Sequence, residues 1–122
     1  MNKPWLSQYG NIPAEININQ FSSIAAIYDD AFARFPERSL DIRIKKTLSY
    51  TEVKAYSDQV GAWLQQRGLQ KGDRVAVMMP NCLQYVVSVA AILRAGFCVV
   101  NVNPFYTTDE LEHQLKDSGA KA

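Results

Sequence analysis

Apolar side chains recur at helical and strand spacings in the first third of the chain. Within residues 23–35 they fall at intervals of three and four, which predicts an amphipathic helix that Pro36 ends. In residues 39–44, SLDIRI, apolar and polar side chains alternate, which predicts a half-buried strand. Lys45 and Lys46 are predicted to form the turn that follows. The fold is therefore expected to begin with a helix, a strand and a turn.

The stretch LSYTEV is typical of a helix N-terminus. Ser49 can accept a hydrogen bond from the backbone N–H of Glu52, and the Glu52 carboxylate can accept one from the N–H of Ser49, which makes a capping box. Leu48 and Val53 stand where a hydrophobic staple belongs. An apolar stripe follows at helical spacing, and Gly68 is suited to a left-handed cap. A helix is therefore predicted between Ser49 and Gly68.

Two short apolar runs flank a long apolar segment in the second half of the chain. Residues 74–79 and 97–102 are predicted to be buried strands, with a helix over 82–95 between them that Gly96 ends. Because this helix is apolar on nearly every side, it is expected to be covered on most sides. The unit 74–102 is then a βαβ unit, which needs parallel strands and a right-handed crossover. The predicted fold class is therefore α/β.

A last helix is predicted after the second of these strands. Thr107 and Glu110 repeat the capping-box spacing, and Gly119 is placed to close the helix. No strand is predicted after it. This arrangement is compatible with a finished domain and also with a chain that was cut from a longer one.

Residues 1–20 show neither helical nor strand periodicity and are predicted to form an extended arm. The arm carries large apolar side chains that could dock on another surface, at Trp5, Tyr9 and Ile12. Two interpretations remain open from the residues alone. The arm docks on its own domain, or it is an interface arm that docks on a partner subunit.

The composition limits the class of protein. The 122 residues are 48% hydrophobic and 20% charged, with a formal net charge of +1, which favours one folded domain and no nucleic-acid partner. No signal peptide and no apolar run long enough to span a membrane is seen, so an intracellular protein is expected. Cys82 and Cys98 lack metal-site spacing and are expected to be buried, reduced thiols.

Few residues suggest chemistry. The chain has no G-x-G-x-x-G and no G-x-x-x-x-G-K-[ST]. His113 is the only histidine and shares a helix face with Asp109 and Glu110, but a surface or packing role is favoured over a metal site. Asn101 and Asn103 interrupt an apolar strand. They either face a ligand crevice or satisfy the turn before a proline, and the second interpretation is favoured.

The stretch LRAGFCVVNVNPFYTTDELEHQLKDSGA resembles the N-terminal part of bacterial long-chain fatty acid–CoA ligases, members of the adenylate-forming superfamily. LSYTEV resembles the first core motif of that superfamily, LRAGFCVVNVNP its second, and PWLSQYGNIPAEI the start of the long-chain group. The resemblance implies a two-step reaction. A fatty acid and Mg–ATP give an acyl-adenylate and pyrophosphate, and coenzyme A then takes the acyl group as a thioester.

The resemblance assigns no catalytic, cofactor-binding or metal-binding residue to this chain. Its phosphate loop and later motifs have no match, so residues 21–122 are expected to be the first part of a truncated large N-terminal domain that is inactive alone and binds neither Mg²⁺ nor ATP. Ser49, Tyr50, Glu52 and Gly96 are interpreted as fold determinants. The parent enzyme is expected in the cytoplasm at the inner membrane, with the rest of the ligase chain and a second subunit as partners. The alternative is a stand-alone α/β binding or dimerisation module.

Overall fold

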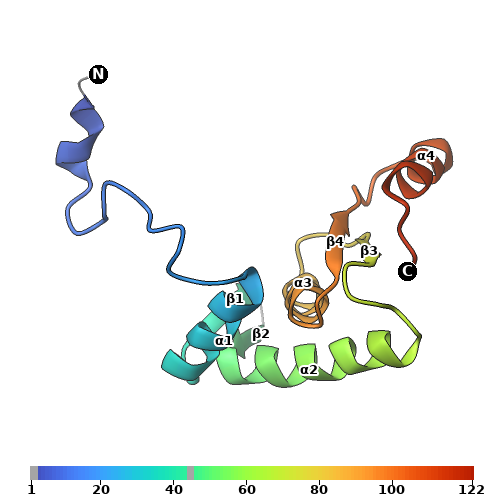
Figure 1. The fold of residues 1–122 in the computed structure, drawn as a ribbon, viewed down its shortest axis with the longest axis horizontal. Helices are drawn as coiled ribbons and strands as arrows, with labels where there is room; N and C mark the ends of the chain where they lie inside the picture. The colour runs from blue at the N-terminus through green and yellow to red at the C-terminus, as the bar shows by residue number, and fades with distance from the viewer. Residues whose placement is uncertain (1–2, 44–45) are drawn as a thin grey trace.

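A body of helices and two small sheets carries an N-terminal arm that runs away from it (Figure 1). The computed structural model describes residues 3–43 and 46–122. The elements in chain order are a 3-10 helix Pro4–Gln8, α1 Ile24–Arg34, β1 Ser39–Arg43, β2 Lys46–Ser49, α2 Tyr50–Gln66, β3 Arg74–Val77, α3 Leu83–Arg94, β4 Cys98–Asn101 and α4 Thr108–Ser118. The predicted α/β class is confirmed.

The helices begin and end where the capping residues predict. Both capping boxes are formed, by Ser49 with Glu52 at α2 and by Thr107 with Glu110 at α4. α4 ends at Gly119, which has the left-handed φ of +62° that a residue with a side chain adopts only with strain. Local side-chain chemistry therefore fixes these helix boundaries.

The first sheet contains a strand that the sequence pattern does not reveal. β1 pairs antiparallel with β2, and the register shifts between Ser39 and Asp41. Lys46, predicted to lie in the turn, is the first residue of β2, while Lys45 and the predicted strand residue Ile44 lie outside the described residues. β2 has four residues with one buried apolar side chain, which is too short for an alternation to be visible.

The second sheet confirms the predicted parallel pair. Arg74 of β3 lies opposite Cys98 of β4, and Val77 lies opposite Asn101. Both strands are shorter than predicted. The other edge of β3 is also occupied, because the N–H of Lys121 donates to the carbonyl of Arg74 at 2.8 Å and the N–H of Ala76 donates to the carbonyl of Ala122 at 2.7 Å. Both edges of β3 are therefore hydrogen-bonded, although residues 121–122 form no strand of the two-stranded sheet.

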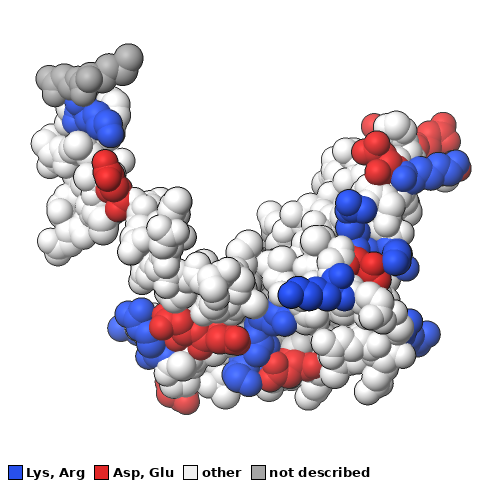
Figure 2. Space-filling model, viewed as in Figure 1, with Lys and Arg blue, Asp and Glu red and all other residues white. Residues whose placement is uncertain are grey.

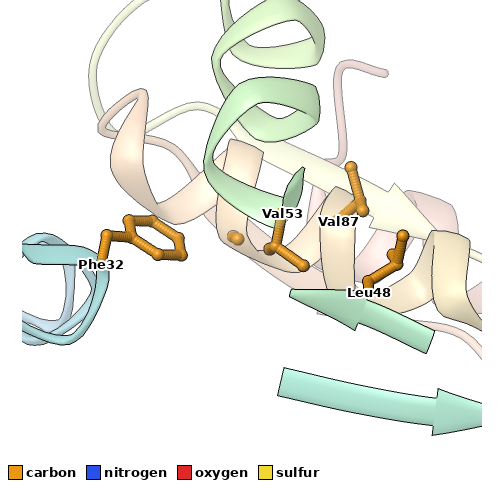
Figure 3. Packing of buried hydrophobic residues seen from close by; sticks show 5 residues of the cluster. Phe32, Leu48, Val53 and Val87 are labelled. Carbon is orange, nitrogen blue, oxygen red and sulfur yellow. The ribbon is translucent and has the colours of Figure 1, made fainter. Parts of the chain in front are cut away.

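Two clusters of buried side chains form the core, and α3 contributes to both of them. The first consists of Phe32, Leu48, Val53, Val87 and Ala90 (Figure 3). The second consists of Leu64, Val75, Val77, Ile92 and Phe97. Because each buried aliphatic side chain contributes about 1.5–3 kcal/mol, the helix that supplies both clusters organises the body.

α2 and α3 are in close contact at Gly61. A Cβ placed on this buried glycine would lie 3.4 Å from the carbonyl oxygen of Ala91 and 3.4 Å from the Cβ of Ala95. A larger side chain would push the two helices apart. The small residues Gly61, Ala91 and Ala95 therefore set the distance between α2 and α3.

Most of the arm is exposed, and only Leu6 and Tyr9 among its described residues are half-buried. Every residue from 11 to 20 is exposed, and the exposed fractions of Trp5 and Ile12 are 53% and 67%. Residues 4–8 form a short 3-10 helix, a departure from the predicted extended chain that Pro4 favours by its fixed φ. Figure 2 shows charged side chains gathered on the body and near α4, with few on the arm.

Candidate functional site

The C-terminal ends of β3 and β4 lie side by side because the strands are parallel. Ligands of open α/β sheets bind at this edge, so it is the first place to look for a site. Asn101 ends β4, and its side-chain oxygen accepts a hydrogen bond from the Tyr85 hydroxyl at 3.0 Å. Its backbone carbonyl accepts one from Nε2 of Gln114 at 2.9 Å. Asn101 therefore ties β4 to both α3 and α4.

Asn103 shapes the turn that follows β4. Its side-chain oxygen accepts the N–H of Phe105 at 3.0 Å, and its carbonyl accepts the N–H of Tyr106 at 3.1 Å. The interpretation that both asparagines satisfy the turn before Pro104 is confirmed for Asn103 and is wrong for Asn101, whose side-chain oxygen accepts from Tyr85. The turn holds Phe105 almost fully in solvent, with 90% of the residue exposed.

Gln114 was missed by sequence reasoning. Within the part of the chain that the structure describes, its Oε1 is a buried side-chain atom without a hydrogen-bond partner, although its Nε2 is bonded to Asn101. A glutamine in a charged helix gives no signal of its own. Only its position over the end of β4 reveals its role.

Arg94 joins three helices. Its Nε donates to Asp29 of α1 at 3.0 Å, and its Nη1 donates to Asp58 and Ser57 of α2 at 2.6 Å and 2.8 Å. Its guanidinium also lies over the ring of Phe32, 5.0 Å from the centroid. The side chain is only 14% exposed. A buried arginine with carboxylates on two other helices therefore fixes how α1 and α2 sit on α3.

The charges of this cluster stabilise one another. Burial acts to raise the pKa of Asp58, but hydrogen bonds from Lys54 and Arg94 outweigh it and hold that pKa below its ordinary value. Burial likewise acts to lower the pKa of Arg94, and the bonds to Asp58 and Asp29 outweigh it, so the pKa is raised. Sequence reasoning noted Arg94 only as a polar residue in an apolar helix. A lone cation in such an apolar helix is the available signal, because a largely buried guanidinium needs carboxylate partners from neighbouring elements.

The capping boxes carry two further perturbed carboxylates. The backbone N–H of Ser49, followed by its hydroxyl, lowers the pKa of Glu52, and Thr107 does the same for Glu110. Both carboxylates act on helix ends, and neither lies beside a nucleophile. The interpretation of Ser49 and Glu52 as fold determinants agrees with this geometry.

The remaining candidates do not assemble into one site. His113 is exposed on α4, which fits its predicted surface role, and within residues 3–43 and 46–122 no three His, Cys, Asp or Glu side chains gather as metal ligands. The prediction that both cysteines are buried is wrong. Cys82 is half-buried at the start of α3, and Cys98 is exposed. Val99 faces the core, so Cys98, one residue earlier, points to the opposite side of β4.

An apolar groove of about 410 Å³ opens between β2, α2 and α3. Leu48, Val60 and Val87 line its apolar floor, and Tyr56 and Met79 lie at its rim with 41% and 37% of each residue exposed. No sequence motif marks this groove, because its residues come from β2, α2, α3 and the loop that precedes α3.

Residues 28–122 match the family described as AMP-binding enzyme. The chain belongs to the AMP-binding enzyme family. Its N-terminal part, residues 1–27, lies outside that match but is covered by individual relatives.

Relatives of this AMP-binding enzyme chain extend the match to its whole length. The long-chain-fatty-acid–CoA ligase of Salmonella typhimurium is 47% identical over 100% of the chain, and the ligase of that name from Bacillus subtilis is 44% identical over 95%. The chain spans 22% and 21% of the lengths of these two curated relatives. The long-chain ligase resemblance seen in the sequence is therefore confirmed.

A solved structure of the same fold agrees. The N-terminal subdomain of Klebsiella oxytoca NpsA, in complex with anthranilyl-AMSN, matches with a TM-score of 0.80 and 25% identity. This match covers 88% of the present chain and 28% of that subdomain chain. The AMP-binding enzyme segment described here therefore corresponds to about a quarter of an N-terminal subdomain.

Within the described residues, no helix is both long and apolar enough to cross a membrane.

Proposed function

We propose that this chain is the N-terminal part of an ATP-dependent long-chain fatty acid–CoA ligase. The observation that carries the proposal is 47% identity over the whole chain to a long-chain-fatty-acid–CoA ligase. In the parent enzyme, a fatty acid carboxylate attacks the α-phosphorus of ATP and displaces pyrophosphate. The thiol of coenzyme A then attacks the acyl carbon of the adenylate and displaces AMP.

The role of residues 1–122 in this reaction is structural. The residues of this segment do not suit Mg–ATP. The sequence has no glycine-rich loop ending in lysine, and no three His, Cys, Asp or Glu side chains gather within the described residues. No step is therefore assigned to a residue of this chain. Its part is to supply β3, β4 and the helices on which the rest of the large domain is built.

A chimera tests the parent function. The matching segment of the Salmonella typhimurium ligase is replaced by this chain, and oleoyl-CoA and AMP formation from oleate, ATP and coenzyme A is measured. We expect activity within about tenfold of the unaltered ligase, because substitutions far from reacting groups usually act through stability. The 122-residue chain alone is expected to form no product. A folded chimera without acyl-CoA formation, or product formed by the chain alone, would contradict the proposal.

A second candidate function is dimerisation through the arm. Several large apolar side chains are exposed on a segment that runs away from the body (Figure 1), and exposed apolar side chains that gather in one region often mark an interaction surface; they are Trp5, Ile12, Ile16 and Ile18. Sedimentation of the chain with and without residues 1–20 tests this function. A dimer that becomes a monomer on truncation supports it, and an unchanged molar mass excludes it.

The same arm is compatible with a peripheral position at the cytoplasmic face of the inner membrane, which is part of the proposal for the parent enzyme. Trp5 and Tyr9 are the side chains suited to a lipid–water interface. Flotation with vesicles of phosphatidylethanolamine and phosphatidylglycerol measures this. Trp5→Ser should reduce the bound fraction, whereas Trp63→Ser on α2 should not.

A further inference from the structure

Basic side chains gather at one end of the sheet that β3 and β4 form. From residue 59 to residue 108 the sequence has one acidic residue, Asp73. The same stretch has four basic residues, which are Arg67, Lys71, Arg74 and Arg94. Figure 2 shows basic side chains close together on the body below α4. The chain is therefore almost neutral as a whole, with a formal net charge of +1, but it is locally basic in this region.

The basic patch consists of Lys71, Arg74 and Lys121, and all three residues are exposed. Lys71 lies in the loop before β3, and Arg74 is the first residue of β3. The backbone N–H of Lys121 donates to the carbonyl of Arg74 at 2.8 Å, which brings Lys121 beside them. Because β3 and β4 are parallel, the patch lies at the N-terminal edge of their sheet, whereas Asn101 lies at the C-terminal edge. A partner bound to the patch would therefore leave the candidate ligand edge open.

The patch keeps a positive charge after its own ion pair is counted. The Oδ1 of Asp73 lies 2.8 Å from the Nζ of Lys121, and its Oδ2 accepts the N–H of Gln70 at 2.8 Å. Both carboxylate oxygens of Asp73 are therefore occupied, and this side chain is only 15% exposed. Among the side chains that the structure describes, no carboxylate is within ion-pair distance of Lys71 or Arg74. These two cations remain for a partner.

The two cations lie on different sides of β3. A Cβ placed on Gly96 would lie 3.5 Å from the Cγ of Lys71, and one placed on Gly119 would lie 3.6 Å from the Nη1 of Arg74. Gly96 precedes β4, and Gly119 precedes the residues that bond to the other edge of β3. A single phosphate needs donors that converge on its oxygens, whereas a layer of anionic headgroups can meet each cation separately.

We infer that the basic patch is a docking surface for a bilayer that contains anionic phospholipid. The inference rests on the proposed ligase function, because it deepens the peripheral position at the membrane that is part of that proposal. It adds a contact that does not involve the arm. Lys3 and Glu15 are the charged side chains of residues 1–20 and offset each other, so the arm gives no preference for anionic lipid.

Flotation with two kinds of vesicle tests the docking surface. The chain is mixed with phosphatidylcholine vesicles that either contain or lack phosphatidylglycerol, and the floating fraction gives a partition coefficient. Phosphatidylglycerol should raise this coefficient at least about tenfold, because each cation near an anionic surface adds to the attraction. Added salt should lower it again, because it screens the surface potential. Equal binding to both kinds of vesicle would overturn the inference.

Two double variants with the same change of net charge locate the effect. Lys71→Gln with Arg74→Gln removes the two cations of the patch, and Arg34→Gln with Lys54→Gln removes two exposed cations elsewhere on the body. The first variant should lower the partition coefficient for phosphatidylglycerol vesicles at least about tenfold, and the second by less than about twofold. Equal decreases would overturn the inference in favour of net charge. Displacement from the vesicles by inorganic phosphate at constant ionic strength would overturn it in favour of a site for a single anion.

The chimera with the Salmonella typhimurium ligase separates this inference from the proposed function. Its flotation and its formation of oleoyl-CoA are measured independently, with and without the substitutions of Lys71 and Arg74. An inactive chimera whose binding to phosphatidylglycerol vesicles depends on the two residues would reject only the proposed ligase function. An active chimera whose binding does not depend on them would reject only the docking surface.

Discussion

The two sides of α2 differ in how completely they are covered. On one side Arg94 closes the contact with α1 and α3 through Asp29, Ser57 and Asp58. On the other side Tyr56 lies at the rim of an open apolar groove. The first side is closed by side-chain contacts, and the second side is an open groove lined mostly by apolar side chains. Polar residues with fixed partners mark the closed side, and exposed apolar area marks the open side.

The largest effect is expected where α2 and α3 meet. Gly61→Leu should lower the free energy of unfolding by about 3 kcal/mol, because the new side chain has no space beside Ala91 and Ala95. Gly61→Ala is the matched control. Its Cβ just fits at 3.4 Å and the helix gains propensity, so a change below about 0.5 kcal/mol is expected from urea unfolding. An equal decrease in the free energy of unfolding for both variants would show that Gly61 does not set the distance between α2 and α3.

A substitution of Arg94 tests the side of α2 that contacts α1 and α3. Arg94→Ala should lower the free energy of unfolding by about 2 kcal/mol, since it removes the ion pairs with α1 and α2 together with the contact to the ring of Phe32. Arg67→Ala is a suitable control, because Arg67 lies over the ring of Trp63 but joins no second helix. Its unfolding midpoint in urea should stay close to that of the unaltered chain. A large decrease in stability for Arg67→Ala would mean that the contacts of arginines with aromatic rings stabilise the body, and not the ion pairs between helices.

The carboxylate of the same cluster gives a smaller, pH-dependent effect. Folding lowers the pKa of Asp58 below its ordinary value of 3.8, so its contribution is present above pH 3.8 and is lost as the pH falls through the lowered value. Asp58→Asn should therefore destabilise the chain at pH 7 by less than about 1 kcal/mol, because the side chain is half exposed. The difference from the unaltered chain should vanish in acid. A difference that persists below the lowered pKa would assign the effect to packing.

The smallest effect is expected on the open side. Met79→Gln keeps the length of the side chain at the groove rim and should change the free energy of unfolding by less than about 0.5 kcal/mol. It should nevertheless reduce the fluorescence of a dye that binds apolar surface. A marked loss of stability would show that the groove side is already packed, and the contrast between the two sides of α2 would disappear.

Local chemistry made most of the fold predictable. The boundaries of α2 and α4 follow from Ser49, Glu52 and Gly119, and the parallel strands follow from the apolar runs around α3. Strand β2 was not predicted, because its stability comes from pairing with β1 and not from its own four residues. Cys98 was wrongly predicted to be buried, because a run of apolar residues does not show which face of an edge strand is covered.

The candidate site was less predictable for the same reason. Asn101 and Asn103 could be singled out, because polar residues in an apolar strand are visible in the sequence. Asn101 bonds to Tyr85 of α3 and Gln114 of α4, and the residues of the groove come from β2, α2, α3 and the loop before α3. Such juxtapositions exist only after the elements have packed.

The hydrogen bonds on the second edge of β3 have a consequence for synthesis on the ribosome. Until Lys121 and Ala122 have left the exit tunnel, Arg74 and Ala76 present open backbone groups on a strand whose other edge is already paired with β4. An open edge on an apolar strand can recruit the strands of neighbouring nascent chains. The interval during which β3 and β4 are complete but residues 121 and 122 are not is therefore when a chaperone that shields strand edges would protect this protein most.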